Sequence, residues 1–211
     1  MSPYFIKICG ITTYDDAVMA IEAGATAIGF NFYSKSKRYI QPERAKEIAD
    51  RIRGKISIVG IFVNEDAAAV RAIGASVKLT YCQFHGDEEP EYVNRFSNAI
   101  KSFRVNESLK NVYFDDYKTA AFLLDAYDEK EFGGTGKTFN WLLAREANEF
   151  GKIILAGGLN DANVIDAIET VEPWGVDVSS GVEIEPGKKD AEKVKKFVLN
   201  ARNAFERSLE I

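Results

Sequence analysis

The chain has 211 residues, with 27 Lys and Arg against 32 Asp and Glu, so that its formal net charge is −5. This acidic balance argues against nucleic acid as a partner, which would require a clustered basic excess. No apolar run approaches the ~20 residues that cross a bilayer, so we expect no membrane partner. His85 is the single histidine, which excludes a His-rich zinc site, and the two cysteines are Cys9 and Cys82. The first residues lack the pattern of a signal peptide, and we expect a cytoplasmic protein.

Short β-rich segments alternate along the chain with segments whose apolar residues have helical spacing. The predicted strands are residues 4–9, 25–31, 56–63, 77–85, 100–105, 120–126, 152–156 and 175–179. The predicted helices are residues 15–23, 42–52, 64–73, 91–100, 138–150, 160–171 and 190–205. Residues 106–117 carry a poor helix signal and are expected to be mostly loop.

Eight strand–helix units, of about 26 residues each, predict a single (β/α)8 (TIM) barrel domain over residues 1–211. The structural alternative is an open, doubly wound sheet. That fold usually carries a glycine-rich dinucleotide turn after its first strand, whereas the turn here reads CGITT at residues 9–13. No linker, low-complexity tract or shift in composition marks a second domain.

Reactive side chains follow the predicted strands, whereas the segments that follow predicted helices are short and lack such side chains. Cys9, Arg38, His85 and Asp125 all lie at or shortly after the end of a strand. Turn geometry alone would explain glycines at these places, but it would not explain the titratable residues. Because active sites of such barrels lie at the carboxyl ends of the strands, the sequence predicts an active site there.

Two late segments have the form of a phosphate site. ILAGGLN at residues 154–160 combines a strand, a glycine pair and a helix start with Asn160 as its N-cap, and DVSSGVE at residues 177–183 combines a strand with Ser-Ser-Gly. The loops after the seventh and eighth strands commonly bind phosphate, through backbone N–H groups that glycine leaves accessible. The residues expected to bind phosphate are Gly157, Gly158, Ser179, Ser180 and Gly181.

Five motifs together resemble those of the phosphoribosylanthranilate isomerase family. They are KICGIT at 7–12, GFNFYSKSKRYI at 29–40, QFHGDE at 83–88, GGTGKTF at 133–139 and DVSSGVE at 177–183. The resemblance runs from the first strand to the last helix, with mild departures at YCQF (81–84) and Asn140. It implies a tryptophan-biosynthesis enzyme that converts N-(5-phosphoribosyl)anthranilate into 1-(2-carboxyphenylamino)-1-deoxyribulose 5-phosphate by an Amadori rearrangement. The implied partner is this small phosphorylated aminosugar, and no metal or organic cofactor is implied.

The resemblance also implies roles for single residues, with Cys9 as the general base and Asp125 as the general acid. An ordinary thiol is only a few per cent ionised at neutral pH, and an ordinary carboxyl group holds almost no proton. We therefore expect the site to lower the pKa of Cys9, or Cys9 to act through its small thiolate fraction, and we expect burial or a nearby negative charge to keep Asp125 protonated. Arg38 is expected to bind the anthranilate carboxylate with its planar guanidinium group.

Other polar residues are expected to face the interior of the barrel. Gln83 and His85 either line the substrate pocket or order the loop that follows them. Asp177 either pairs with Lys7, on a strand that becomes its neighbour when the barrel closes, or contacts the substrate. Cys82 is expected to point toward the helices as part of the core. Residues 128–137, with their glycine-rich centre, are expected to close over bound substrate.

Two other functions are weighed against this one. The isomerase of histidine biosynthesis performs the same rearrangement on a larger bisphosphorylated substrate, but it typically carries Asp at the end of its first strand, where this chain has Cys9. A phosphate-binding barrel without activity is the second alternative, and the presence of both Cys9 and Asp125 argues against it. The sequence leaves open whether the protein is a monomer or a homodimer.

Overall fold

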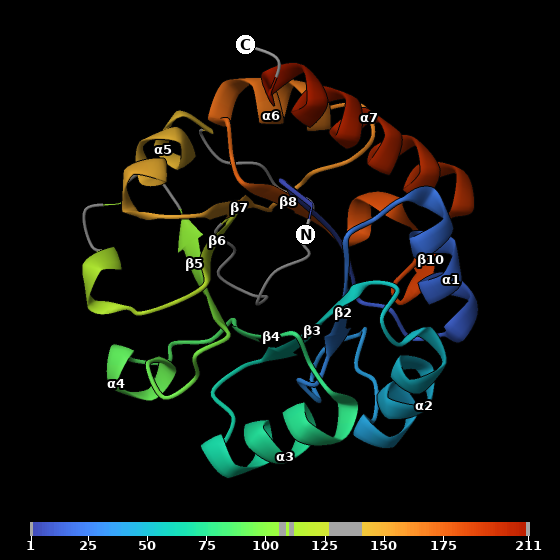
Figure 1. The fold of residues 1–211 in the computed structure, drawn as a ribbon, viewed down its shortest axis with the longest axis vertical. Coiled ribbons are helices and arrows are strands. Elements are labelled where there is room, and N and C mark those ends of the chain that lie inside the picture. The colour runs from blue at the N-terminus through green and yellow to red at the C-terminus, as the bar shows by residue number, and fades with distance from the viewer. Residues whose placement is uncertain (1, 106–108, 110–111, 127–140, 210–211) are drawn as a thin grey trace.

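The computed structural model describes residues 2–105, 109, 112–126 and 141–209. Its centre is a closed barrel in which eight strands pair in chain order and the first strand pairs in parallel with the eighth (Figure 1). The strands are Phe5–Cys9 (β1), Ala27–Asn31 (β2), Ser57–Phe62 (β3), Tyr81–Phe84 (β4), Ala99–Val105 (β5), Ala121–Ala126 (β6), Ile153–Leu155 (β7) and Gly175–Val178 (β8). The predicted barrel is confirmed.

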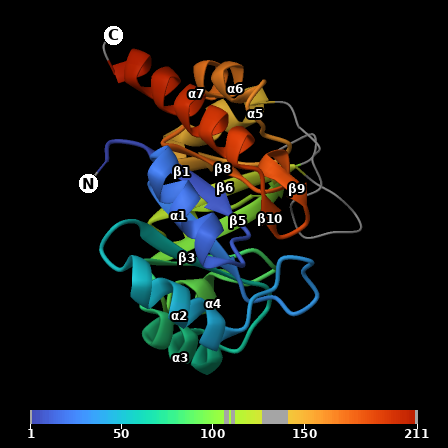
Figure 2. The same ribbon diagram turned by 90° about the vertical axis from the view of Figure 1, so that its right-hand side faces the viewer.

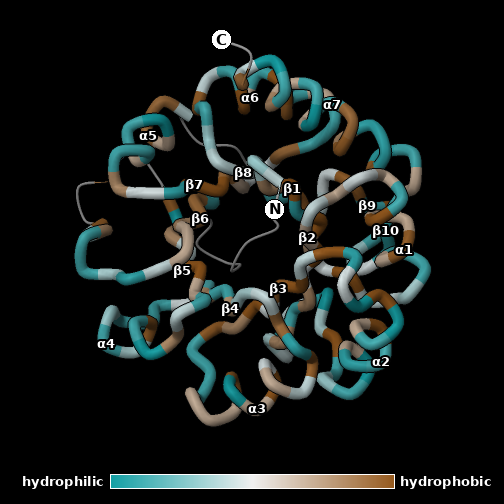
Figure 3. The backbone as a smooth tube through the Cα atoms, viewed as in Figure 1, coloured by the Kyte–Doolittle hydropathy of each residue, from teal (hydrophilic) through white to brown (hydrophobic). Residues whose placement is uncertain are grey.

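Helices surround this barrel, and Figure 3 shows hydrophilic residues concentrated in the outer ring. They are Tyr14–Ala23 (α1), Pro42–Ile52 (α2), Ala67–Val77 (α3), Pro90–Val93 (α4), Trp141–Glu146 (α5), Val164–Val171 (α6) and Ala191–Leu209 (α7). Short 3-10 turns follow at Phe114–Asp116, Ala147–Phe150 and Ser180–Val182. Within the described residues, no helix is both long and apolar enough to cross a membrane.

Helix α3 lies later in the chain than predicted. It begins at Ala67 because the Asp66 carboxylate accepts hydrogen bonds from the N–H groups of Ala68 and Ala69. It ends at Val77, where Lys78 adopts the left-handed conformation with φ 60°. The prediction that the fourth strand begins at residue 77 is therefore wrong, because that valine closes the helix.

The predicted helix over residues 91–100 is also wrong, since α4 ends at Val93 and β5 begins at Ala99. The apolar residues in this segment have helical spacing but belong to two different layers. Phe96 packs on Phe84 outside the barrel, with ring centroids 4.9 Å apart, whereas Ile100 lies in the interior cluster. The predicted helix 160–171 begins only at Val164, because Asn160 caps the preceding turn, where its side chain accepts N–H bonds from residues 162 and 163.

Side chains of successive strand residues point alternately into and out of the barrel, which separates two cores. On β1, Ile6 and Ile8 pack under the helices, whereas Lys7 and Cys9 point inward. Cys82 on β4 belongs to the outer core, as predicted. The interior cluster comprises Phe5, Ala27, Val59, Ile100, Ala121, Leu123, Ile154 and Ala156. Most of the inward positions that follow toward the carboxyl ends of the strands are polar, with Ile61 and Val63 as apolar members.

A two-stranded antiparallel hairpin follows the eighth strand, and it was not predicted. It consists of Glu183–Glu185 (β9) and Lys188–Lys189 (β10), joined by a turn in which Gly187 has φ 86°. The side view in Figure 2 shows this hairpin at the end of the barrel opposite the N-terminus. The hairpin therefore lies at the end where the sequence predicts the active site.

Candidate active site

A cavity opens at the carboxyl ends of the strands and collects most of the predicted site residues. Its lining comprises Cys9, Asn31, Tyr33, Ser36, Arg38, Ile61, Val63, Gln83, His85, Asp125, Asp177 and Ser179. These residues come from β1, β2, β3, β4, β6 and β8, from the positions just after these strands, and from the loop that follows β2. Gln83 and His85 thus line the cavity, which was one of the two roles that the sequence left open.

Four polar contacts cross the interior beneath and beside this cavity. The Nζ atom of Lys7 donates to Oδ2 of Asp177 at 2.8 Å and to Oε1 of Gln83 at 2.9 Å. The Nε2 atom of Gln83 lies 2.9 Å from Nδ1 of His85, and Nε2 of His85 lies 3.4 Å from Oδ2 of Asp125. All five side chains are buried. A continuous polar row therefore links β8, β1, β4 and β6.

Lys7 and Asp177 form an ion pair at the place where the barrel closes, since they are register partners on β1 and β8. Burial, the largest single effect, would lower the pKa of Lys7, but the charges of Asp177 and Cys9 and the hydrogen bonds to both together outweigh it, and the pKa is raised. Asp177 also lines the cavity, and its Oδ1 atom is buried without a hydrogen-bond partner among the described residues. Pairing with Lys7 is thus observed, and the second oxygen can accept a bond from a ligand.

Cys9 ends β1 at the floor of the cavity, and its thiol is not in a disulfide. A Cβ atom on Gly29 would lie 3.0 Å from the Sγ atom, so the glycine provides the space that the thiol occupies. Burial is the main cause that raises the pKa of Cys9, with a contribution from Asp177, while Lys7, Lys189 and Arg38 act in the opposite direction. The pKa of Cys9 is therefore raised in the structure without substrate, so the expectation that the site by itself lowers this pKa is wrong.

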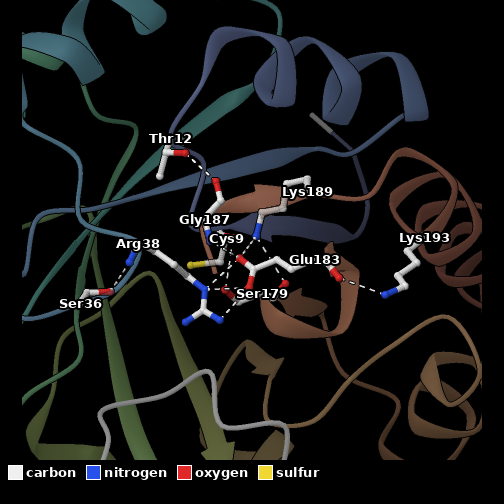
Figure 4. A network of polar contacts seen from close by, with 9 residues as sticks. All are labelled: Cys9, Thr12, Ser36, Arg38, Ser179, Glu183, Gly187, Lys189 and Lys193. Carbon is white, nitrogen blue, oxygen red and sulfur yellow. Dashed lines mark hydrogen bonds and ion pairs between the residues drawn. The ribbon is translucent and has the colours of Figure 1, made fainter. Parts of the chain in front are cut away.

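Arg38 reaches the cavity from the loop after β2, where the carboxylate of Glu183 holds its guanidinium group (Figure 4). The Nε atom donates to Oε1 at 2.9 Å, and Nη2 donates to Oε2 at 2.7 Å. A two-pronged contact of this kind fixes the plane of the guanidinium group. Arg38 is thus placed at the cavity with a defined orientation, as its expected role requires.

Glu183 and Lys189 of the hairpin belong to the site although sequence reasoning gave them no role. Lys189 Nζ donates to Oε1 of Glu183 at 2.8 Å, and both side chains are buried. Burial alone would raise the pKa of Glu183, but Arg38 and Lys189 outweigh it and the pKa is lowered. Burial lowers the pKa of Lys189, and Glu183 offsets this only in part. The signal that could have revealed them is a charge in each short strand around the Pro-Gly turn at 186–187.

The two predicted phosphate-binding segments lie against each other. A Cβ atom on Gly181 would lie 1.9 Å from the carbonyl oxygen of Leu159, so the loops after β7 and β8 are in direct contact at that point. Gly157 and Gly158 both have positive φ, 82° and 66°. Ser180 begins the 3-10 turn after β8. The five predicted residues thus lie on two loops at one end of the barrel.

Some predictions fall on residues that the structure does not describe. The loop 128–137, expected to close over substrate, lies outside the described residues, as do Asn140 and the first residues of the predicted helix 138–150. Among the residues that are described, no group of three or more His, Cys, Asp or Glu side chains is arranged to hold a metal ion.

Comparison with known proteins identifies the family to which this site belongs. The sequence model of N-(5'phosphoribosyl)anthranilate (PRA) isomerase matches residues 6–200. The chain belongs to the N-(5'-phosphoribosyl)anthranilate isomerase family. The family member from Geotalea uraniireducens is 52% identical over 198 residues, which cover 93% of this chain and 98% of that protein. The chain is therefore an isomerase of tryptophan biosynthesis, and the histidine-pathway alternative is set aside.

Solved isomerases of this family have the same barrel. The phosphoribosyl anthranilate isomerase of Thermotoga maritima is 38% identical and superimposes with a TM-score of 0.88, covering 95% of this chain and 99% of that one. An isomerase solved in complex with reduced 1-(o-carboxyphenylamino)-1-deoxyribulose 5-phosphate is also 38% identical, with a TM-score of 0.84 and the same coverage.

Proposed function

We propose that this isomerase rearranges N-(5-phosphoribosyl)anthranilate without a cofactor, with Cys9 as the general base and Asp125 as the general acid. The observation that carries the proposal is that one cavity is lined by both residues, from β1 and β6, together with Arg38. The likeness to an isomerase solved with a reduced aminodeoxyribulose phosphate supports a ligand of this class.

Ring opening is the first step of the proposed reaction. Asp125 donates its proton to the ring oxygen while the bond between C1 and that oxygen breaks, and the nitrogen lone pair forms the C1=N bond of a protonated Schiff base. Asp125 suits this role because its carboxyl group is only 5% exposed and yet lines the cavity. A buried acid delivers its proton to the substrate without competition from bulk water.

Proton abstraction follows. Cys9 removes the proton from C2, the released electron pair forms the C1=C2 bond, and the C=N electrons return to nitrogen. The resulting enolamine gains a proton at C1 and loses its hydroxyl proton at C2 to become the ketose. The protonated Schiff base adds a positive charge beside Cys9 to the effect of Lys7 and Lys189, which favours the thiolate. The Cys9 thiol thus releases its proton to solvent more readily once the Schiff base has formed, and the resulting thiolate is the base that takes the C2 proton.

Binding is assigned to the remaining residues of the site. Arg38 binds the anthranilate carboxylate, and Glu183 supports this assignment because it orients the guanidinium group. Gln83, His85 and Asp177 line the cavity around the ribose. The phosphate group is bound by Gly157, Gly158, Ser179, Ser180 and Gly181, on two loops that contact each other.

Turnover is tested with substrate formed in situ, by following the loss of anthranilate-type fluorescence. We expect full activity without added metal and no effect of a chelator. Activity that a chelator abolishes and a divalent ion restores would contradict the cofactor-free mechanism.

Location and assembly complete the proposal. We place the enzyme in the cytoplasm, which the free thiols of Cys9 and Cys82 support, since reducing compartments preserve thiols. We propose that the enzyme is a monomer or a homodimer. Sedimentation analysis distinguishes the two states, and a larger assembly would contradict both.

A further inference from the structure

The amide group of Gln83 lies between two partners that together fix its orientation. On one side is the ammonium group of Lys7, which has hydrogens to donate and no lone pair, so it requires the amide oxygen. The observed contact is 2.9 Å from Nζ to Oε1. The amide nitrogen therefore faces the other side, where it lies 2.9 Å from Nδ1 of His85.

An amide nitrogen donates hydrogen bonds and does not accept them. The Nδ1 atom of His85 must therefore be the acceptor, which means that it carries no proton. A neutral imidazole ring without a proton on Nδ1 carries its proton on Nε2. The two hydrogen bonds of Gln83, one from Lys7 and one to His85, thus determine the tautomer of the His85 ring, although Lys7 does not contact that ring.

We propose that Gln83 is a positioning residue that holds His85 as the neutral Nε2–H tautomer, so that His85 offers the substrate a fixed, uncharged hydrogen-bond donor beside Asp125. His85 is 7% exposed, and its Nε2 atom has no hydrogen-bond partner among the described residues. Asp125 Oδ2, at 3.4 Å, is the nearby acceptor, and both side chains line the cavity. The donor is therefore available to a ligand oxygen that lies next to the acid.

The absence of charge on this ring matters because of its neighbour. An imidazolium ion 3.4 Å from Asp125 would favour the carboxylate form of the residue that must hold a proton. A neutral donor can align the substrate with a much smaller effect of this kind, because it carries no net charge. The importance of a neutral ring rests on the proposed role of Asp125 as the acid, whereas the tautomer itself does not.

Other charged groups on the strands around His85 already have opposite charges beside them. These ion pairs are Lys101 with Glu88 at 2.9 Å, Arg104 with Asp87 at 2.6 Å, and Lys7 with Asp177 at 2.8 Å. Each pair keeps its own charge compensated, and Asp125 is a titratable group directly beside the ring, at 3.4 Å. Protonation at Nδ1 would in addition break the bond with Gln83.

The tautomer can be read directly because His85 is the single histidine of the chain. Protein without a histidine tag, grown with 15N-labelled histidine, gives one pair of ring nitrogen signals in a long-range 1H–15N spectrum. At neutral pH and without ligand we expect a protonated Nε2 and an unprotonated Nδ1. A protonated Nδ1, alone or together with Nε2, would overturn the proposal without any measurement of activity.

The Gln83→Glu variant tests the positioning role. Its carboxylate can still accept from Lys7, but it also accepts a proton-bearing Nδ1, so we expect the ring to become protonated there. We further expect kcat to fall by about ten-fold or more, with KM within several-fold and a changed pH–rate profile. The matched control is Cys82→Ala, on the same strand but in the outer core, which should leave the ring signals, kcat and pH profile unchanged.

Two results would separate this inference from the proposed mechanism. A changed tautomer in Gln83→Glu with unaltered kcat and pH profile would overturn the positioning role and leave Cys9 and Asp125 in place. An Asp125→Asn variant with normal kcat would overturn the acid assignment, while the tautomer of wild-type His85 would still be measured. If Gln83→Glu does not fold, the spectrum of the wild-type protein alone decides the tautomer.

Discussion

The two reacting side chains of the proposed mechanism differ in their surroundings. Cys9 lies among three cations, Lys7, Lys189 and Arg38, yet burial keeps its pKa raised. Asp125 lies against the imidazole ring of His85. In the proposed mechanism, a positively charged intermediate adds to the effect of these cations and favours the thiolate, so that Cys9 acts as a base only when substrate is bound.

Cys9→Ser and Asp125→Asn should each remove one step of the proposed reaction. A hydroxyl group is a far weaker acid than a thiol, so serine forms almost no anion at neutral pH that could act as the base. Asparagine has no acidic proton to deliver. We expect kcat to fall by roughly 10²–10⁴-fold in each variant, with KM within several-fold. Steady-state kinetics by fluorescence measures both constants. Near-normal kcat in Cys9→Ser at neutral pH would show that another group is the base.

Arg38→Ala should act mainly on binding. Loss of hydrogen bonds to a charged carboxylate weakens binding by about 1.5–3 kcal/mol, which corresponds to a KM increase of about 10–100-fold. Arg38→Lys keeps the charge but not the planar pair of donors, and we expect an intermediate KM. The control is Arg44→Ala, whose side chain is exposed on α2. An unchanged KM in Arg38→Ala would remove this residue from the carboxylate site.

The strands of the barrel bring the loops that follow them together at one end. The loops after β7 and β8 contact each other directly there. Gly181→Ala would place a Cβ atom 1.9 Å from the Leu159 carbonyl oxygen, so one loop must move. We expect KM and the inhibition constant of inorganic phosphate to rise strongly. Gly74→Ala is the control, because its Cβ would make only a 3.9 Å contact in α3 and should stabilise that helix by about 0.5–1 kcal/mol. Equal phosphate affinity in wild type and Gly181→Ala would contradict the phosphate assignment.

The hairpin β9–β10 should make stability depend on pH through Glu183. Its folded pKa is lowered, so its contribution to stability is fully present above the ordinary glutamate pKa of about 4.3 and is lost as the pH falls through the lowered value. We expect the free energy of unfolding in urea to decrease below about pH 4.3, and to decrease less in Glu183→Gln. Glu47→Gln, in an exposed ion pair, is the control. Identical pH curves for wild type and Glu183→Gln would contradict the expectation.

Helices and strands were predictable from sequence where all apolar residues of a segment pack in the same layer of the molecule. Helix α2 was predicted with its observed bounds, since its first residue is Pro42 and its apolar residues share one face. The segment after β4 was not, because the apolar Phe96 and Ile100 serve different cores. The hairpin was missed because its strands are too short and polar to show alternation. Pattern reasoning therefore fails where adjacent apolar residues pack in different layers, or where ion pairs replace apolar packing.

On the scale of the whole molecule, the ion pair between β1 and β8 joins the first strand of the barrel to the last. Lys7→Met would leave Asp177 buried without its partner, and loss of one member of a buried pair costs about 3–5 kcal/mol. We expect a decrease of this size in the free energy of unfolding in urea. Arg44→Met, which breaks an exposed pair, should change it by about 0–1 kcal/mol. A decrease below 1 kcal/mol in Lys7→Met would show that the pair is not a structural requirement.

The barrel and the end that carries the cavity were predictable from the order of strands, because the carboxyl ends of parallel strands meet. The contacts within the site were only partly predictable. Lys7 and Asp177 could be paired because closure makes their strands neighbours. The Glu183 contact with Arg38 joins residues 145 positions apart through a hairpin whose weak signal, a charge in each short strand, does not specify the partner of either charge.

The closing ion pair also has a consequence for the order in which the protein is made. Lys7 and Asp177 are 170 positions apart, and synthesis proceeds from the N-terminus at about 5–20 residues per second. During most of that time Asp177, the ion-pair partner of Lys7, has not yet been made, and an uncompensated buried ammonium group is strongly unfavourable. A growing chain that lacks β8 is therefore discouraged from collapsing around β1 into a smaller barrel. The charge that serves the finished site thus also delays closure until the eighth strand has emerged from the ribosome.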